Sequence, residues 1–252
     1  MASKAPAKLK DATKYTSKEW RALGGIAEPT TREKMIMLAI EQIKRVGPVD
    51  FNALEICERL DIKAPMVNYH FGSRDGFIAE TTWFAYQMWT TQVDECIRSA
   101  PKDPVKRLRA FIKGEVTWAK RMGGMHILIN YPLTSSNSQA ILVEKHAQQM
   151  QKAFDYHLAL LSVIIRDIDR GTVSDLEFDA DSLPRKEFLL TPGYLLKATQ
   201  ISWATHGLAS WSSGKHVPTL HMESNAFAQI TSEIAANAMV EAIISIATMS
   251  EK

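Results

Sequence analysis

One stretch of the chain, residues 52–77, constrains the fold more than any other. It reads NALEICERLDIKAPMVNYHFGSRDGF and predicts two short helices, a tight turn between them and the start of a third helix. Asn52 is suited to cap the first helix, and Glu55 three residues later is suited to complete a capping box. Pro65 is tolerated only in the first turn of the second helix, where its missing N–H has no partner anyway. The pattern therefore predicts a helix-turn-helix, whose second helix enters the major groove of DNA.

The part of this stretch from residue 62 to 75, IKAPMVNYHFGSRD, resembles the signature of the TetR family of bacterial transcriptional regulators. In that family an aromatic-rich recognition helix ends in His-Phe, followed by a small residue, Ser and Lys. Asn68 stands where the family usually has a Tyr, and Arg74 replaces the Lys, which keeps the charge but changes its geometry. Asp61 replaces a turn Gly and tolerates a left-handed backbone better than most residues. The resemblance covers about residues 31–80.

Side-chain chemistry divides the predicted recognition helix into two kinds of contact. Lys63, Tyr69 and His70 suit phosphates, which position a protein on DNA without reading its sequence, although His70 suits a packing role equally well. Asn68 and Met66 suit base edges, because Asn pairs with adenine and an apolar group contacts the thymine methyl. The predicted DNA-contacting set is Thr31, Asn52, Lys63, Ala64, Met66, Asn68, Tyr69, His70 and Arg74.

A helix is predicted on each side of this motif. Residues 30–46 form the first, because Thr30 and Glu33 make a capping box and apolar residues recur every three or four positions until Gly47. Thr31 in its first turn suits a phosphate, although simple capping explains that turn equally well. Ser73 is expected to cap a long helix that continues to about Arg98. The family resemblance implies that this helix acts as a lever between the DNA-binding head and the rest.

The first 29 residues are rich in Lys, Ala and Thr and show no sustained apolar period. They are predicted to form a flexible basic arm, either a solvated tail or a segment that tracks phosphates beside the main site. Tyr15 and Trp20 are unusual in a pure tail and suit an anchor to the body. The whole chain carries a net charge of only +2, so any basic surface has to be local.

The remaining sequence predicts an all-α fold with no strand pattern and no repeats. Short connections between long amphipathic helices indicate an antiparallel bundle. Acidic residues crowd the stretch 171–190, which reads as a solvated loop. The expected domains are the arm at 1–29, a helix-turn-helix domain at 30–79 and a helical ligand-binding and dimerisation domain at 80–252. Helices are expected at 103–121, 124–130, 135–169, 192–213 and 223–249.

The last predicted helix is apolar on most sides, with Glu241 as its only charge between residues 234 and 249. Such a helix has to be buried on most sides, by its own bundle and by a second subunit. The helix at 192–213 is its expected partner in a four-helix, two-fold interface, the arrangement that the family resemblance also implies. The predicted homodimer interface contains Trp211, Ala235, Met239, Ala242 and Ile246.

Aromatic, Met and His side chains gather in the predicted bundle interior. Ordinary core packing explains any one of them. Together they suit a mostly apolar pocket with a few orienting polar groups, and the family resemblance implies a small-molecule effector there. The Gly123-Gly124 pair before a short helix suits the lip of such a pocket. The predicted ligand-binding set is Trp118, Met122, His126, Tyr131, Phe154, His157, Trp203 and His206.

Other functional classes find little support in the sequence. The two cysteines lie outside any metal-binding or redox motif, no apolar run reaches the ~18–20 residues of a membrane span, and no cofactor motif appears. We therefore expect a cytoplasmic, non-enzymatic, ligand-responsive repressor that binds a palindromic operator as a homodimer. A transcriptional activator or a protein-controlled regulator of the same fold remains an alternative, and a helical-bundle enzyme is the least favoured one.

Overall fold

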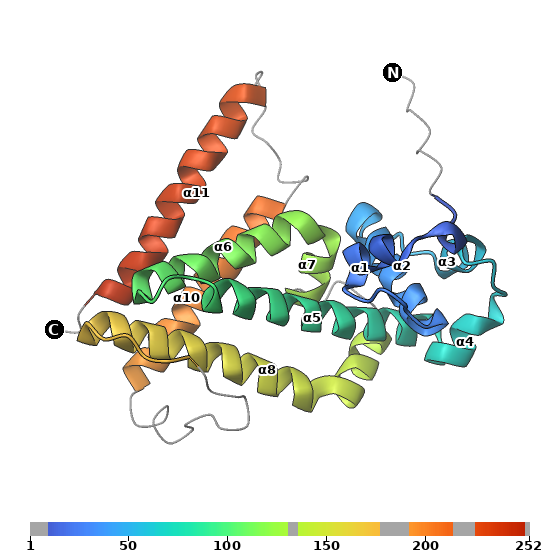
Figure 1. Ribbon diagram of the computed structural model, residues 1–252, viewed down its shortest axis with the longest axis horizontal. Helices are drawn as coiled ribbons and strands as arrows, with labels where there is room; N and C mark the ends of the chain where they lie inside the picture. The colour runs from blue at the N-terminus through green and yellow to red at the C-terminus, as the bar shows by residue number, and fades with distance from the viewer. Residues whose placement is uncertain (1–9, 131–135, 177–191, 214–224, 250–252) are drawn as a thin grey trace.

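The computed structural model describes residues 10–130, 136–176, 192–213 and 225–249, and all regular elements within these ranges are helical. The all-α prediction is confirmed. Figure 1 shows an elongated molecule with a small N-terminal head at one end and a larger helical body at the other. No helix in the described ranges combines the length and the apolar character that crossing a bilayer requires.

The head is built on α2, whose two ends follow from the sequence. Thr30 and Glu33 form the expected capping box, and Gly47 ends the helix with a positive φ of 86°. Nearly the whole middle of α2 is buried, so the other head helices pack around it. The head contains a 3-10 turn η1 (Ala12–Lys14), α1 (Ser17–Gly24), α2 (Thr31–Val46), α3 (Ala53–Arg59) and α4 (Pro65–Phe71).

The segment before α2 corrects one prediction. Residues 10–29 are not a flexible tail, because Thr16 and Glu19 form a capping box that starts α1. Trp20 is buried against the head, and the ring of Tyr15 packs on it with centroids 4.9 Å apart. The arm therefore contributes to the head core from residue 10 onward, while residues 1–9 lie outside the described part.

The body surrounds α5 (Arg74–Arg98), which begins in the head at the Ser73 cap and extends through the centre of the molecule. Helices α6 and α8 lie on opposite sides of α5, α10 crosses them behind, and α11 projects from the end away from the head (Figure 1). The predicted boundaries agree with these elements to within two residues. The remaining body helices are α6 (Pro104–Met122), α7 (Gly124–Asn130), α8 (Ser136–Arg170), α10 (Pro192–Ser213) and α11 (Asn225–Thr248).

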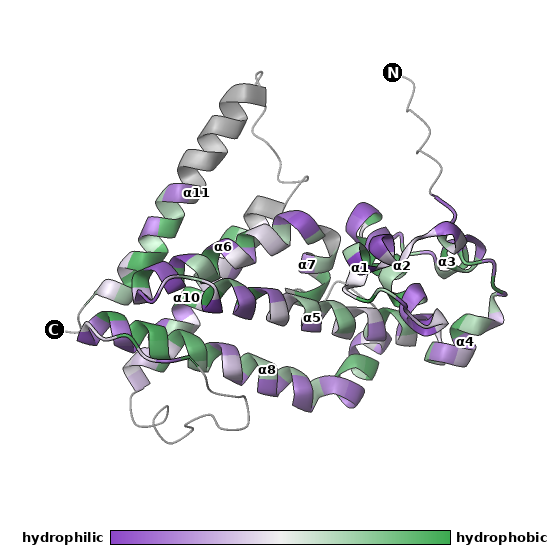
Figure 2. Ribbon diagram, in the orientation of Figure 1, coloured by the Kyte–Doolittle hydropathy of each residue, from purple (hydrophilic) through white to green (hydrophobic). Residues whose placement is uncertain are grey.

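Apolar stripes explain how these helices pack. On α6, for example, Leu108, Phe111 and Ile112 are almost fully buried, while charged residues cover the outer side. Figure 2 shows that α8 is also divided by hydropathy. Hydrophilic residues lie on its outer side, and hydrophobic residues are concentrated toward its C-terminal end. Of the predicted acidic loop, the described part ends at Leu176, which is buried, and the rest lies outside the described residues.

Candidate nucleic-acid interface and effector site

The turn between α3 and α4 has the expected backbone. Asp61 has a φ of 51° and is the single non-glycine residue with positive φ among the described residues. The amide of Ile62 then donates to the carbonyl of Cys57 at 3.0 Å, which closes the turn. Pro65 occupies the first turn of α4 as predicted. The local sequence thus places α4 across the end of the head in the order expected of a helix-turn-helix.

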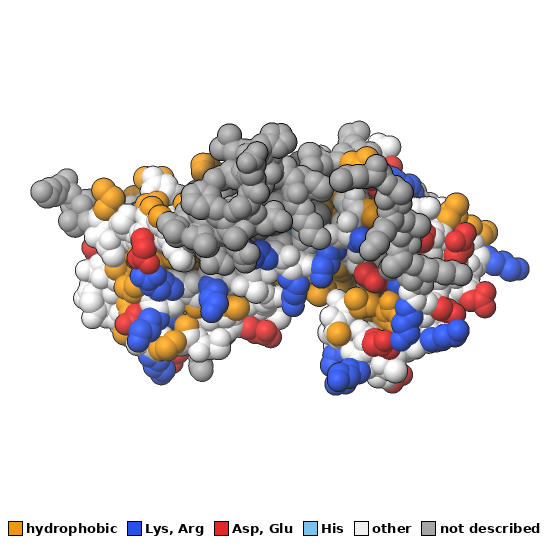
Figure 3. Space-filling view, turned by 90° about the horizontal axis from the view of Figure 1, so that it is seen from above, with side chains coloured by type: hydrophobic (Ala, Val, Ile, Leu, Met, Phe, Trp, Pro, Cys, Tyr) orange, Lys and Arg blue, Asp and Glu red, His pale blue; other side chains and the backbone are white. Residues whose placement is uncertain are grey.

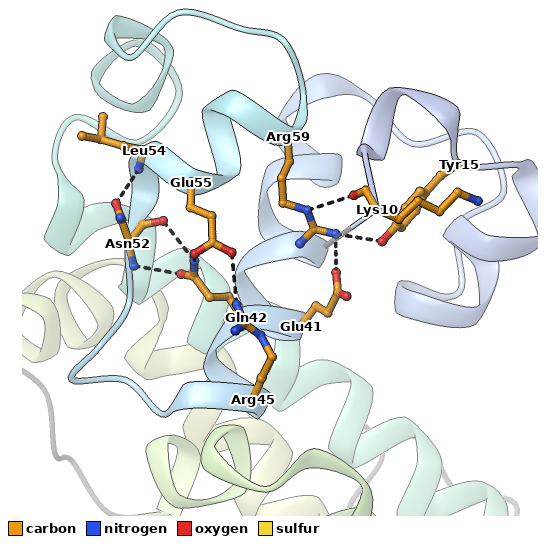
Figure 4. Close-up of polar contacts among 9 residues, drawn as sticks. All are labelled: Lys10, Tyr15, Glu41, Gln42, Arg45, Asn52, Leu54, Glu55 and Arg59. Atoms are coloured by element: carbon orange, nitrogen blue, oxygen red, sulfur yellow. Dashed lines mark hydrogen bonds and ion pairs between the residues drawn. The ribbon is translucent and has the colours of Figure 1, made fainter. Parts of the chain in front are cut away.

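Polar contacts hold α3 in place (Figure 4). The side chain of Asn52 accepts from the amide of Leu54 at 3.0 Å, which confirms it as the cap of α3. The predicted capping box with Glu55 is wrong, because Glu55 instead accepts from Gln42 at 2.8 Å and from Arg45 at 3.1 Å on α2. Contacts to a neighbouring helix have replaced a local one, so α3 is fixed against α2.

The second anchor of α3 is Arg59, whose side chain is buried. It donates to Glu41 at 3.0 Å, to the hydroxyl of Tyr15 at 2.8 Å and to the carbonyl of Lys10 at 3.3 Å (Figure 4). Two of these partners belong to the N-terminal segment. The basic arm therefore supports the helix-turn-helix from behind through its described residues.

The inner face of α4 is fixed by aromatic packing. Val67 and Phe71 are buried, and the ring of Phe71 stacks on Phe77 with centroids 4.2 Å apart. The guanidinium of Arg74 lies 5.5 Å from the ring centroid of Phe51 and donates to the carbonyl of that residue at 3.0 Å. Arg74 is exposed, yet its described contacts hold the loop before α3, and its predicted phosphate contact remains a prediction.

The outer face of α4 and the turn before it carry most of the predicted DNA-contacting residues. Lys63, Ala64 and Asn68 are exposed, and Tyr69 is 79% exposed. Met66 and His70 are half-buried. The buried Nε2 atom of His70 has no hydrogen-bond partner. Two further members of the set, Thr31 in the first turn of α2 and Asn52 at the start of α3, are exposed as well.

The charge on the head is mixed. Figure 3 shows Lys and Arg side chains on the described surface of the head, interspersed with Asp and Glu. The head therefore carries no uniform positive field, and any surface on it that attracts anions has to be local.

A polar cluster links the head to the body. Glu80 on α5 accepts from Arg32 on α2 at 2.6 Å, and from Lys145 and His146 on α8 at 3.3 Å each. The ring of Trp83 stacks on His146 with centroids 4.9 Å apart. Burial raises the pKa of Glu80, but hydrogen bonds from Arg32 and His146 outweigh it, so the pKa lies below its ordinary value. An ionised Glu80 therefore connects three helices across the junction.

A second contact between body and head is made by the bend between α6 and α7. Gly123 has a φ of 49°, and a Cβ placed on it would lie 3.2 Å from the carbonyl oxygen of Lys44 in the last turn of α2. Helix α7 itself packs on α2 and carries His126, whose side chain is fully buried. The glycine pair singled out in the sequence thus lies where body and head touch.

The predicted ligand-binding residues divide into two groups. Trp118, Met122, His126 and His157 are buried in the body, and His206 lies close to them on α10. The other group corrects the prediction. Phe154 is 36% exposed and Trp203 is 70% exposed, so in a single chain neither lines an internal pocket. Tyr131 lies outside the described residues.

The sequence analysis missed the residue at the centre of the buried group, Glu115. Its side chain is completely buried, and its Oε2 atom accepts from the indole N–H of Trp89 at 2.9 Å. The ring of Trp89 contacts Tyr86, His157 and His206, with centroids 5.1, 5.3 and 5.8 Å away. One signal was available in the sequence, because Glu115 is a charged residue within the apolar stripe of α6, between Ile112 and Trp118.

Burial controls the ionisation of two histidines in this group. It lowers the pKa of His126 to about 4 and also lowers the pKa of His157, against the opposing effect of the Glu115 carboxylate. Both side chains are therefore neutral at neutral pH.

Among the described residues, no three His, Cys, Asp or Glu side chains are placed to hold a metal ion.

The body also has a surface cleft of about 310 Å³ at the end away from the head. It lies between the end of α5 and the first half of α6. Arg109, one of the cationic residues that line the cleft, forms a bidentate ion pair with Glu241 on α11. Its two guanidinium nitrogens lie 2.5 and 2.9 Å from the two carboxylate oxygens. The cleft is lined by Cys96, Ser99, Ala100, Pro101, Lys106, Arg109, Ala110 and Lys113.

The predicted dimer residues have mixed positions. On α11, Met239 and Ala242 are exposed, and Ile246 is half-buried. The adjoining face of α11 is buried against the body through Ile243 and Ala247. The side chains of Trp211 and Ala235 lie outside the described residues.

Comparison with known proteins adds little. No family model matches the chain, and no curated protein matches it. Among solved structures, a match covers 85% of this chain and 90% of a structure described as "the putative transcriptional regulator from Pseudomonas aeruginosa PAO1", at 17% identity and a TM-score of 0.47. A likeness at this level supports no inference about function.

Proposed function

We propose that the chain is a ligand-responsive regulator of transcription that binds a palindromic operator as a homodimer and acts as a repressor. The observation that supports this most is the division of α4 into two faces. Val67 and Phe71 hold the inner face, while Asn68 and Tyr69 on α4, and Lys63 in the turn before it, are exposed. The ring of Tyr69 also contacts that of His70, with centroids 4.9 Å apart. Exposed cationic, amide and aromatic side chains on the second helix of a helix-turn-helix are the groups that contact DNA.

The residues on the outer side of α4 and in the turn before it have distinct proposed roles. Lys63 neutralises a phosphate, and the hydroxyl of Tyr69 donates to another, so both position the head on the duplex. Asn68 pairs with an adenine in the major groove, and Met66 contacts a thymine methyl. The resemblance of residues 62–75 to the TetR signature supports the same assignment.

Dimerisation is proposed on the outer face of α10 and α11. Leu196 and Trp203 are exposed seven residues apart, and therefore lie on the same face of α10. Exposed large apolar side chains in register mark an interaction surface. A two-fold dimer through this face and the outer face of α11 would present two copies of α4, which suits half-sites about 34 Å apart.

Regulation is proposed to pass from the body to the head through two contacts. A ligand beside Glu115 would move α7, because α7 carries His126 and packs on the end of α2. The Glu80 cluster would transmit the same shift from α5 and α8 to Arg32. The ligand changes DNA affinity only by its differential affinity for the two conformations, typically about 1–3 kcal/mol.

The test is selection of genomic fragments with the purified full chain, followed by sequencing of the bound DNA. The proposal predicts enrichment of one pseudo-palindrome whose half-sites are about one helical turn or a multiple apart. Recovery of only salt-sensitive, sequence-independent DNA would contradict it. A reporter carrying the recovered site next to a promoter then distinguishes repression from activation.

A further inference from the structure

Unpartnered polar atoms are concentrated in the body core. In the described part of the chain, seven buried side-chain polar atoms have no hydrogen-bond partner, and six of them lie on α6, α8 and α10. Native proteins leave few such atoms, and each requires an explanation. One of the six is Arg107 Nε, whose guanidinium donates to the carbonyl of Ser174 through another nitrogen. The remaining five are Glu115 Oε1, Trp118 Nε1, His157 Nε2, Thr205 Oγ1 and His206 Nε2.

Of the five residues, Glu115 is the one whose missing partner is the most costly. Its side chain has no exposed surface, and only one of its two oxygens is used, by the N–H of Trp89. Burying a carboxylate is costly unless a cation or several donors compensate it. The free oxygen, Oε1, lies 3.7 Å from Nε2 of His206, which is longer than a hydrogen bond, and both atoms remain without a partner.

The other nearby histidines do not compensate the charge. Burial keeps His126 and His157 neutral, as their lowered pKa values show. Nδ1 of His157 lies 3.0 Å from the carbonyl of Ala153 and carries the proton, since a carbonyl only accepts. Nε2 of His157 therefore presents a lone pair. The core thus offers two acceptors, Glu115 Oε1 and His157 Nε2, that no donor satisfies.

The aromatic rings around this carboxylate favour the same kind of occupant. Trp89 carries the donor to Glu115, and the rings of Tyr86, His157 and His206 lie within 6 Å of its centroid. Faces of Trp and Tyr attract cations, most strongly where water is excluded. A positive charge next to Glu115 and a flat apolar group against these rings would satisfy both features.

We propose that the body binds an organic cation, a protonated amine carried on an aromatic or otherwise apolar group, with its N–H donating to Glu115 Oε1. This rests on the proposed function in one respect, that the occupant of the core is the regulating ligand. The proposed effector is thus not merely apolar, but an apolar molecule that carries one basic nitrogen. Thr205 and Trp118 would then be available to polar groups elsewhere on the ligand.

The experiment compares amines with alcohols of the same shape. Calorimetry at neutral pH measures binding of benzylamine, naphthylmethylamine and biphenylmethylamine, each beside its alcohol, to the ligand-free full chain. Glu115→Gln keeps the size of the side chain and an acceptor for Trp89. Glu144→Gln, on the exposed side of α8, is the matched control.

We expect at least one amine to bind about tenfold or more tightly than its alcohol. Glu115→Gln should remove that difference by weakening the amine alone, and Glu144→Gln should preserve it. Equal binding of amine and alcohol in all three pairs, including no binding of either, would overturn the proposal. So would an amine preference that Glu115→Gln leaves intact.

A second measurement needs no ligand. Since the Glu115 side chain is fully buried and one of its oxygens has no partner, Glu115→Gln should melt at the same temperature as the ligand-free wild type or at a higher one. A carboxylate that served only packing would give a lower melting temperature, which would contradict the assignment.

Failure of this inference is distinguishable from failure of the proposed function. DNA selection uses the ligand-free chain and does not depend on the class of ligand. A recovered palindrome without amine preference would refute the cation site alone. An amine preference without sequence-specific DNA binding would refute the regulator alone.

Discussion

Gly76→Ala is expected to disrupt the junction between α4 and α5. A Cβ at Gly76 would lie 2.1 Å from the carbonyl oxygen of Phe71, the last residue of α4. Carbon–oxygen contacts normally begin at roughly 3.3 Å, so α4 or α5 has to retreat by roughly 1.2 Å. The displaced atom belongs to the backbone, which cannot swing aside as a flexible side chain does.

The magnitude follows from two opposing effects. Overpacking of this kind costs about 1–3 kcal/mol, and backbone contact places it at about 3 kcal/mol. Alanine recovers up to about 1 kcal/mol through its helix propensity, which leaves about 2 kcal/mol of destabilisation. For a chain of this length that lowers the melting temperature by about 4–8 °C if unfolding is two-state. Displacing the end of α4 should also reduce operator affinity at least about tenfold.

Gly114→Ala is the matched control, because Gly114 is also a buried helical glycine. Its nearest neighbours are side-chain atoms of Cys96 at 3.3 Å, which have more freedom to move. Circular dichroism melting and fluorescence anisotropy with labelled operator measure both effects. If Gly76→Ala melts and binds operator as Gly114→Ala does, the described approach of α4 to α5 is incorrect.

Further perturbations test the head, the junction and the dimer surface. Lys63→Ala should weaken binding to all DNA sequences and reduce the slope of log affinity against log salt by about 1, and Tyr69→Phe should weaken all sequences without that change of slope, in titrations at several salt concentrations. Because the folded pKa of Glu80 lies below its ordinary value of 4.5, the stability it provides is present above that value and is lost as pH falls through the lower folded value. Glu80→Gln should therefore destabilise the chain by about 1 kcal/mol at neutral pH, by removing the charge that Arg32 contacts, and by less near pH 3, in denaturant unfolding. Trp203→Lys should convert the dimer to monomers in analytical ultracentrifugation at micromolar concentration, and unchanged association would exclude this face as the interface.

The sequence predicted the elements well because their ends are local. Ser73 and Thr30 each cap a helix through contacts within three residues, and Asp61 takes the left-handed conformation that the turn requires. Such signals depend on neighbouring residues and survive whatever the rest of the chain does. The helix-turn-helix and the body helices were therefore predictable in position.

Contacts between distant residues were not predictable in this way. Glu55 was expected to complete a local cap, but Gln42 and Arg45 provide stronger partners from another helix. The N-terminal segment was expected to be flexible, because no periodicity reveals that Tyr15 supports Arg59. Local sequence does not record which elements become neighbours after folding.

The candidate effector site shows the same limit. Aromatic and His residues were grouped by type, which placed Trp203 in the core although it lies on the surface. The rotation of α10 decides which of its residues face inward, and an apolar helix with two buried sides gives no clear direction. Glu115 was overlooked because a charge in a helix is usually solvated, and its burial depends on four packed helices.

The most direct test of the central claim is a comparison of the DNA motifs selected by the wild type and by Asn68→Ala. If α4 reads bases, the variant should recover a motif that has lost its preference at one position in each half-site. Gln148→Ala, exposed on α8, should recover the wild-type motif. A variant that binds every sequence equally less well, with the motif unchanged, would show that Asn68 contacts no base and would contradict the assignment of α4 as the reading helix.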